Sequence, residues 1–92
     1  MMARIALHGF VDGKVQGVGF RQGTWREAER LGLAGWVRNR DDGRVEIWIE
    51  GEAAAVDRLV DWLADGPPGA AVTEVRLEPC PPEGLRAFVI RR

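Results

Sequence analysis

The order of its periodic segments constrains this fold most, because five strand patterns are interrupted by two helical ones. Alternating apolar and polar residues predict strands at 4–11, 35–39, 44–50, 72–78 and 87–91. Helical spacing predicts helices at 21–31 and between Gly51 and Gly66. Two helices cannot cover both faces of a five-stranded sheet, so both are expected on one face. The order therefore predicts an α+β, ferredoxin-like sandwich, βαββαββ, with two helices on one face of a five-stranded, mostly antiparallel sheet.

The segment 44–50 has the cleanest alternation and predicts which side chains face the core. Three β-branched residues are expected to point inward, namely Val45, Ile47 and Ile49. The residues between them, Glu46, Trp48 and Glu50, are expected to point toward solvent. The sheet face away from the helices is therefore expected to stay partly open and to carry tryptophans and charged residues.

Length and composition indicate one small domain without a cofactor. The 92 residues suffice for a single core, so residues 1–92 are interpreted as one domain. Cys80 is the only cysteine and His8 the only histidine, which excludes an internal disulfide, a thiolate metal cluster and a two-histidine metal site. Cys80 stands between two prolines and is interpreted as a loop residue without a catalytic role. No metal and no other cofactor are expected.

The charges are nearly balanced overall but unevenly distributed. The net charge of −1 gives no support for binding to nucleic acid or to an anionic membrane. Residues 1–40 hold seven lysines and arginines against three acidic residues, whereas residues 41–92 hold six against eleven. The positive first half suits an anionic ligand. The sequence has no long apolar run and no pattern of a secretory leader, so a soluble, cytoplasmic protein is expected.

The segment Val15–Arg21 has the residues of an anion-binding turn. Gly17 and Gly19 permit a turn whose backbone N–H groups point at one spot, and the helix that follows adds its own N–H groups. Arg21 falls in the first helical turn, where its guanidinium can bind two anionic oxygens. The spacing matches neither a GxGxxG loop nor a P-loop. On these residues alone, a plain β-to-α turn with a surface arginine is the alternative interpretation.

A side chain that could act as a nucleophile, or hold one in place, is harder to find, because the chain contains no serine and no tyrosine. Asn39 is the candidate, at the end of a predicted strand and eighteen residues after Arg21. Its amide donates and accepts hydrogen bonds, and near a phosphoryl group it could hold a water molecule without becoming charged. Asparagine shortly before Asp42-Gly43 is also typical of an ordinary turn, which is the alternative interpretation.

The two blocks together resemble the acylphosphatase family. The first, from Gly13 to Arg21, reads GKVQGVGFR, and the second joins GWVRN at 35–39 to DGRVE at 42–46. The resemblance runs nearly end to end, as far as the FVI of the last strand. It implies the same fold, with a sheet order of 4-2-3-1-5. It also implies hydrolysis of acyl phosphates to a carboxylate and inorganic phosphate, for which no metal ion is required.

By this resemblance, backbone N–H groups of the loop bind the phosphoryl group. The implied phosphate-binding residues are Gln16, Gly17, Val18, Gly19, Phe20 and Arg21. Arg21 is then the phosphate-binding arginine, Asn39 orients the attacking water, and Thr24 supports the site from the helix. The expected partners are a small acyl phosphate, with inorganic phosphate or sulfate as ligand. A monomer that binds neither nucleic acid nor membrane is expected.

Two other classes of function stay open at this point. A non-catalytic, ferredoxin-like domain with an anion-binding or regulatory role would need the loop, but it would not need a water-orienting amide at Asn39. An RNA-binding sheet would use Trp36 and Trp48 as stacking platforms, although the net charge and the glutamates beside Trp48 oppose it.

Overall fold

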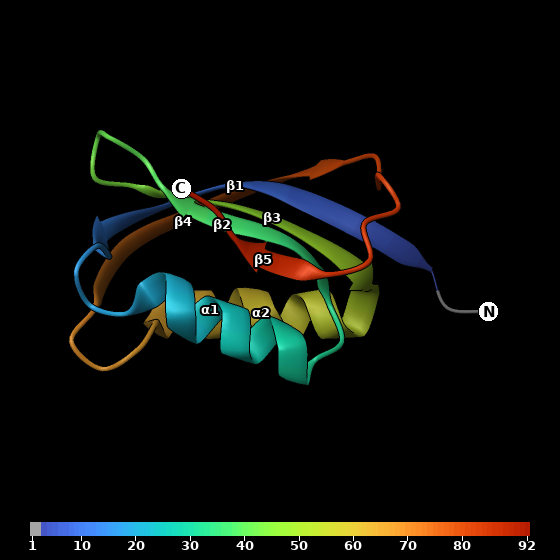
Figure 1. Ribbon diagram of the computed structural model, residues 1–92, viewed down its shortest axis with the longest axis horizontal. Coiled ribbons are helices and arrows are strands. Elements are labelled where there is room, and N and C mark those ends of the chain that lie inside the picture. The colour runs from blue at the N-terminus through green and yellow to red at the C-terminus, as the bar shows by residue number, and fades with distance from the viewer. Residues whose placement is uncertain (1–2) are drawn as a thin grey trace.

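The computed structural model describes residues 3–92 and shows two layers, a sheet and a pair of helices that cover one of its faces (Figure 1). The strands are β1 (Arg4–Lys14), β2 (Ala34–Asn39), β3 (Val45–Glu52), β4 (Ala71–Cys80) and β5 (Phe88–Ile90). The helices are α1 (Phe20–Arg30) and α2 (Ala53–Asp65). The predicted order βαββαββ and the ferredoxin-like sandwich are confirmed.

The strands lie in the order β4-β1-β3-β2-β5, with β2 and β5 parallel and all other neighbours antiparallel. The expected order 4-2-3-1-5 is therefore wrong, because it exchanges β4 and β5. The physical reason is that each βαβ crossover of this split pattern skips one strand position. The crossover through α1 leaves room for β3 between β1 and β2. The crossover through α2 passes β1 to reach its free edge, so β5 takes the edge beside β2.

The core lies between the helices and the inner face of the sheet. Val45, Ile47 and Ile49 of β3 are fully buried there, as their alternation predicts. The helix residues that complete this core are Phe20, Thr24 and Ala28 of α1 and Val56, Leu59 and Leu63 of α2. Val15, just after β1, is also buried, so the connection from β1 to α1 is anchored in the core at both ends.

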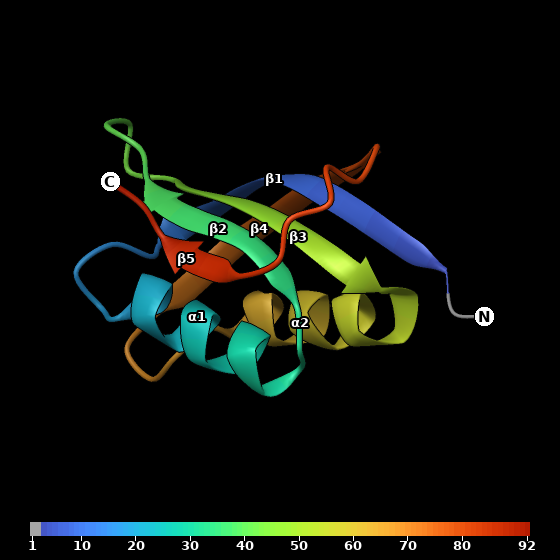
Figure 2. The same cartoon turned by 45° about the vertical axis from the view of Figure 1, so that its right-hand side comes forward.

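The outer face of the sheet is less open than the sequence predicts. The expectation that Glu46 and Glu50 face solvent is wrong, because these residues are only 6% and 0% exposed. Topology explains the burial of Glu50: β4 and β5 occupy opposite edges, so the chain between them must cross the sheet (Figure 2). That connection donates three backbone N–H groups to the Glu50 carboxylate, from residues 83, 84 and 85.

Two strands are longer than predicted because they pair with each other. β1 continues to Lys14 and β4 to Cys80, and the two run antiparallel along most of their length. Cys80 is therefore the last, half-buried residue of a strand, and its interpretation as a loop residue is wrong. Within residues 3–92, no helix has the length and apolar character needed to cross a membrane.

Candidate functional site

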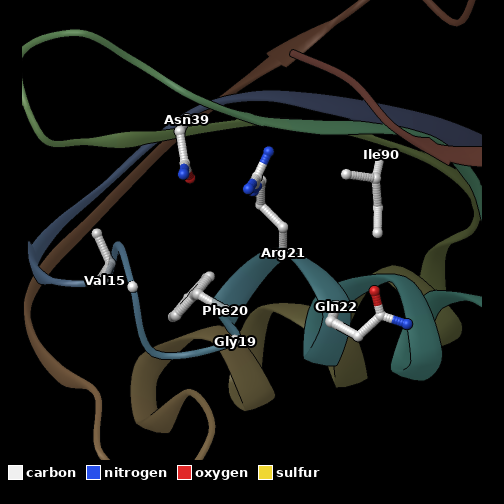
Figure 3. A pocket seen from close by; sticks show the side chains of 8 residues that line it. Val15, Gly19, Phe20, Arg21, Gln22, Asn39 and Ile90 are labelled. Carbon is white, nitrogen blue, oxygen red and sulfur yellow. The ribbon is translucent and has the colours of Figure 1, made fainter.

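A pocket of about 210 Å³ lies where the connection between β1 and α1 faces the end of β2 (Figure 3). Its walls come from that connection and the first turn of α1, from the last residue of β2, and from β5. The lining residues are Val15, Gly17, Gly19, Phe20, Arg21, Gln22, Asn39 and Ile90. The two blocks that stand out in the sequence thus meet in one pocket.

Two glycines give the connection its shape. Gly17 and Gly19 have φ values of 75° and 77°, in the left-handed region that favours glycine. A Cβ atom at either position would meet nothing within 4 Å, so backbone conformation, and not lack of space, calls for glycine. Gly19 is the N-cap of α1, and no side chain within residues 3–92 caps this helix. The first N–H groups of α1 therefore keep their capacity to bind a ligand at the pocket wall.

Arg21 brings a positive charge to the same pocket. It lies in the first turn of α1, and its guanidinium extends toward the side of the pocket that Asn39 occupies (Figure 3). None of the salt bridges formed within residues 3–92 includes Arg21. An uncompensated guanidinium beside the positive end of a helix favours an anionic ligand with several oxygens.

Asn39 faces Arg21 from the sheet. It is the last residue of β2, paired with Val45, and its side chain points into the pocket (Figure 3). Its Oδ1 is buried and accepts no hydrogen bond from residues 3–92. A buried acceptor without a partner costs about 1–3 kcal/mol, so this oxygen is positioned for a ligand or a water molecule.

The hairpin turn after Asn39 does not depend on its side chain. The backbone N–H of Arg40 donates to the carbonyl of Arg44 at 2.8 Å, and that of Gly43 donates to the carbonyl of Arg40 at 3.2 Å. The carboxylate of Asp42 accepts from the backbone N–H of Arg44. The turn is therefore closed by other groups, which weakens the alternative that Asn39 is only a turn former.

Three of the residues singled out in the sequence do not line the pocket. The side chain of Gln16 turns away and donates to backbone carbonyls of the β2–β3 hairpin. Val18 is partly buried against the core. Thr24 is fully buried, and its hydroxyl donates to the carbonyl of Phe20 at 2.8 Å, one turn earlier in α1. Thr24 therefore contacts the first turn of the helix and not the pocket itself.

Sequence reasoning missed two lining residues, Gln22 and Ile90, and it included Val15 in the anion-binding turn without assigning it a role. Ile90 is the most informative, because it comes from β5 at the far end of the chain. It reaches the pocket because β5 runs parallel to β2, with Ile90 beside Val37. The position of Ile90 at the pocket could have been predicted only from the strand order of the sheet, and the expected strand order was wrong.

Glu46, on the outer face of the sheet, pairs with charged residues on both sides of Asn39. Burial alone would raise the pKa of Glu46, but hydrogen bonds from His8 and Arg38 outweigh burial and hold that pKa below its ordinary value. Glu46 also pairs with Arg40 at 3.1 Å, so the arginines on either side of Asn39 are compensated while Arg21 is not.

The pocket is suited to holding an anion and a neutral molecule beside it. The part of its wall formed by residues 3–92 includes no carboxylate and no histidine. In the same part of the chain, no three histidine, cysteine, aspartate or glutamate side chains gather in a way that could hold a metal ion. Charge stabilisation there would come from N–H groups and one guanidinium.

Comparisons with known proteins agree on one family. The family model described as Acylphosphatase matches residues 7–90. A curated protein of Pseudomonas paraeruginosa named acylphosphatase is 57% identical over 91 residues, which cover 99% of this chain and 100% of that protein. One of Gloeobacter violaceus with the same name is 51% identical over 92 residues, covering 100% of this chain and 99% of that protein. The solved structure of an acylphosphatase from Coxiella burnetii superimposes with a TM-score of 0.92 at 42% identity, over 96% of this chain and 93% of that one.

Proposed function

Since the chain belongs to the acylphosphatase family, we propose that its loop 15–19, Arg21 and Asn39 form the centre at which it hydrolyses acyl phosphates. The enzyme's reaction splits a mixed anhydride of a carboxylic acid and phosphoric acid into a carboxylate and inorganic phosphate. The observation that carries the residue assignment is the buried, unpartnered Oδ1 of Asn39 in the same pocket as the uncompensated guanidinium of Arg21.

The phosphoryl group binds at the start of α1. Backbone N–H groups of the loop and of the first helical turn donate to its oxygens, and Arg21 binds two of them at once. Phe20 contributes its backbone N–H, while its ring is buried in the core. Gly17 and Gly19 line the pocket through their backbone and leave the oxygens room. The charge that builds on the equatorial oxygens during transfer is stabilised by these same donors.

Asn39 holds the attacking water. Its Oδ1 accepts a hydrogen bond from the water, which fixes the direction of the water's lone pair toward phosphorus, opposite the acyl oxygen. The water oxygen forms the new bond to phosphorus, the bond from phosphorus to the acyl oxygen breaks, and that oxygen leaves as part of the carboxylate. A carboxylate is a good leaving group, so no general acid is needed. The proton lost by the water passes to a phosphate oxygen, because the described wall of the pocket offers no carboxylate or histidine to accept it.

The substrate is a small molecule that needs no metal ion for its hydrolysis. The guanidinium of Arg21 and the N–H groups supply the positive potential that a metal would otherwise provide. Residues 1–92 act as one domain, and the enzyme acts as a monomer. The single cysteine fits work in a reducing compartment such as the cytoplasm.

Hydrolysis of benzoyl phosphate by the purified chain in the presence of EDTA tests this proposal. Turnover should persist with the chelator, and inorganic phosphate should inhibit it competitively. The variant Arg21→Ala should weaken phosphate inhibition by roughly 10- to 100-fold, the worth of charge-assisted hydrogen bonds. Arg26→Ala, on the exposed side of the same helix, is the matched control and should behave as the parent.

Two outcomes would contradict the assignment. Activity that disappears with EDTA and returns with Mg²⁺ would show that a metal does what is assigned here to Arg21. Phosphate inhibition that is equal in Arg21→Ala and Arg26→Ala would show Arg21 to be a surface residue.

A further inference from the structure

Gln16 is the only polar side chain in the loop 15–19, and it does not point into the pocket. Its Nε2 donates to the backbone carbonyl of Arg40 at 2.7 Å and to that of Arg44 at 3.0 Å. These two carbonyls lie 24 and 28 positions away in the chain, on the two arms of the hairpin that joins β2 to β3. One amide thus ties the loop to both arms of the hairpin.

The two acceptors stand directly beyond Asn39. Asn39 pairs with Val45 as the last rung of the β2–β3 ladder, and Arg40 and Arg44 are the next residues on either side. The Arg44 carbonyl also accepts from the backbone N–H of Arg40 at 2.8 Å, so the pair that Gln16 holds is itself closed. Fixing this pair relative to the loop therefore fixes the backbone next to Asn39 relative to the loop.

We propose that Gln16 is a positioning residue that sets the distance between the phosphate-binding loop and the side chain of Asn39. The inference rests on the roles proposed above for the loop and for Asn39. The loop holds the phosphoryl group and Asn39 holds the water, and the two come from segments that the chain connects only through α1. In-line attack requires both reactants to be placed to within a fraction of an ångström, and an error of about 1 Å can cost on the order of 10²-fold in rate.

The chemistry of the tie explains why an amide stands at this position. Both partners are carbonyl oxygens, so the side chain must present N–H donors, and the Nε2 of glutamine has two. A carboxylate of the same shape would place lone pairs against lone pairs. An apolar side chain of similar length would fill the space without donating. The structure therefore offers two substitutions of near-equal size that break the tie in different ways.

The first test is the kinetics of Gln16→Met with benzoyl phosphate. The glycine conformations and Arg21 are untouched, so the inhibition constant of inorganic phosphate should change by less than about threefold, while kcat should fall by roughly 10- to 100-fold. Asp42→Ala is the matched control, because it removes two hydrogen bonds to Arg44 in the same turn but none to the loop. Its kcat should stay within about twofold of the parent value.

A double-mutant cycle shows whether Gln16 acts through Asn39. In an Asn39→Ala background no water-holding amide is left to be misplaced, so Gln16→Met should have little further effect on kcat. Equal losses in both backgrounds would overturn the inference, because Gln16 would then act on the loop alone. An unchanged kcat in Gln16→Met, with Asn39→Ala strongly impaired, would also overturn it while leaving the proposed function intact. An unimpaired Asn39→Ala would contradict the proposed function itself, and the inference with it.

The second variant, Gln16→Glu, adds a pH readout of the hydrogen bonds between the loop and the hairpin. At neutral pH its introduced carboxylate repels both carbonyls, and kcat should fall at least as far as in Gln16→Met. As the pH is lowered the carboxyl group becomes protonated, regains one O–H donor, and can bond one of the two carbonyls. The ratio of the variant's kcat to that of the parent should therefore rise as the pH falls. A ratio that is independent of pH would contradict the inference even if the Met variant did not fold.

Discussion

The amide of Asn39 differs from a carboxylate in one property that matters beside a phosphoryl group: it carries no charge. A carboxylate at the end of β2 would hold a water equally well but would repel the dianion that we propose Arg21 and the loop bind. The Oδ1 of Asn39 is already buried and has no hydrogen-bond partner within residues 3–92. The free-energy cost of removing this oxygen from water is therefore met during folding, before a ligand binds. This preorganisation suits an interaction that counts in the transition state.

Asn39→Ala should therefore lose turnover far more than binding. Removing one preorganised side chain that acts in the transition state costs roughly 10²- to 10³-fold in kcat, whereas phosphate should still bind through the loop and Arg21. Steady-state kinetics with benzoyl phosphate, alongside calorimetric titration with inorganic phosphate, separates the two effects. The free energy of unfolding should fall by no more than about 1 kcal/mol, because the removed Oδ1 accepts no hydrogen bond within residues 3–92. A variant that keeps its kcat and merely unfolds more easily would show that Asn39 only ends the strand.

At this scale the sequence was informative where function depends on residue type and spacing. Arg21 and Asn39 could be chosen once the two blocks together resembled one family, whereas each residue alone was equally consistent with an ordinary turn. The side-chain contacts of Gln16 could not be predicted, because its partners are backbone carbonyls whose position depends on how the hairpin closes. The burial of Thr24 against Phe20 was equally hidden, since a helical stripe shows which face is buried but not which carbonyl a hydroxyl reaches.

Helix α1 has a glycine in the same backbone conformation next to each of its ends, but only one of these glycines lies at the pocket. It begins after Gly19 and ends before Gly32, and both glycines have left-handed φ, 77° and 70°. A Cβ would meet nothing within 4 Å at either position, so the two sites are matched in conformation and in space. Only Gly19 lies at the pocket. Comparing substitutions at these two glycines therefore separates the effect of backbone strain on stability from its effect on ligand binding.

Gly19→Ala and Gly32→Ala should each lower the free energy of unfolding by about 1–2 kcal/mol, since an L-residue is strained in the left-handed region. Urea denaturation measures this loss. Only Gly19→Ala should also weaken phosphate binding, by about fivefold or more, because relief of the strain turns N–H groups away from the pocket. Equal phosphate affinity in the two variants would show that the conformation at Gly19 serves the helix start and not the ligand.

The type of each element was predictable from periodicity, but the partners of the edge strands were not. The alternation of Val45, Ile47 and Ile49 sets the face of β3 whatever its neighbours are. A short last strand such as β5 carries no pattern that distinguishes the edge beside β1 from the edge beside β2. That choice follows from the crossovers through α1 and α2, and it decides whether Ile90 reaches the pocket.

For the molecule as a whole, the chain that crosses the sheet from β4 to β5 is held by the carboxylate of Glu50 and by Arg4, which donates to the carbonyl of Leu85. Within residues 3–92, the fully buried Glu50 accepts six hydrogen bonds: two from Arg4, one from Trp48 and three from backbone N–H groups of residues 83–85. This contact could not be predicted, because alternation along β3 assigns Glu50 to the outer face and cannot reveal that another segment covers that face.

The protonation of Glu50 should contribute to the loss of stability of the fold in acid. Burial alone would raise its pKa, but the hydrogen bonds from Glu83, Trp48, Arg4 and Gly84 outweigh burial and lower the pKa from 4.5 to about 2. A carboxyl group whose pKa is depressed in the folded state stabilises the protein above the unfolded pKa and loses that contribution as the pH falls toward the folded pKa. A shift of this size corresponds to about 3 kcal/mol, all of it present at pH 7 and lost between pH 4.5 and about 2.

Glu50→Gln tests this by removing the charge at nearly constant shape. At pH 7 the variant should be less stable than the parent by about 3 kcal/mol. The reason is that one carboxylate oxygen, which now accepts hydrogen bonds from N–H groups, would be replaced by an amide nitrogen that cannot accept them. The parent should lose stability between pH 4.5 and 2 more steeply than the variant, so the two should converge at the acid end. Urea denaturation at several pH values measures both effects.

The matched control is Glu78→Gln, at an exposed carboxyl group on the same sheet face that has no hydrogen bond within residues 3–92. This variant should change the free energy of unfolding by less than about 0.5 kcal/mol. If Glu50→Gln and Glu78→Gln gave parallel stability curves, the crossing chain would be held by its packing and not by the buried charge.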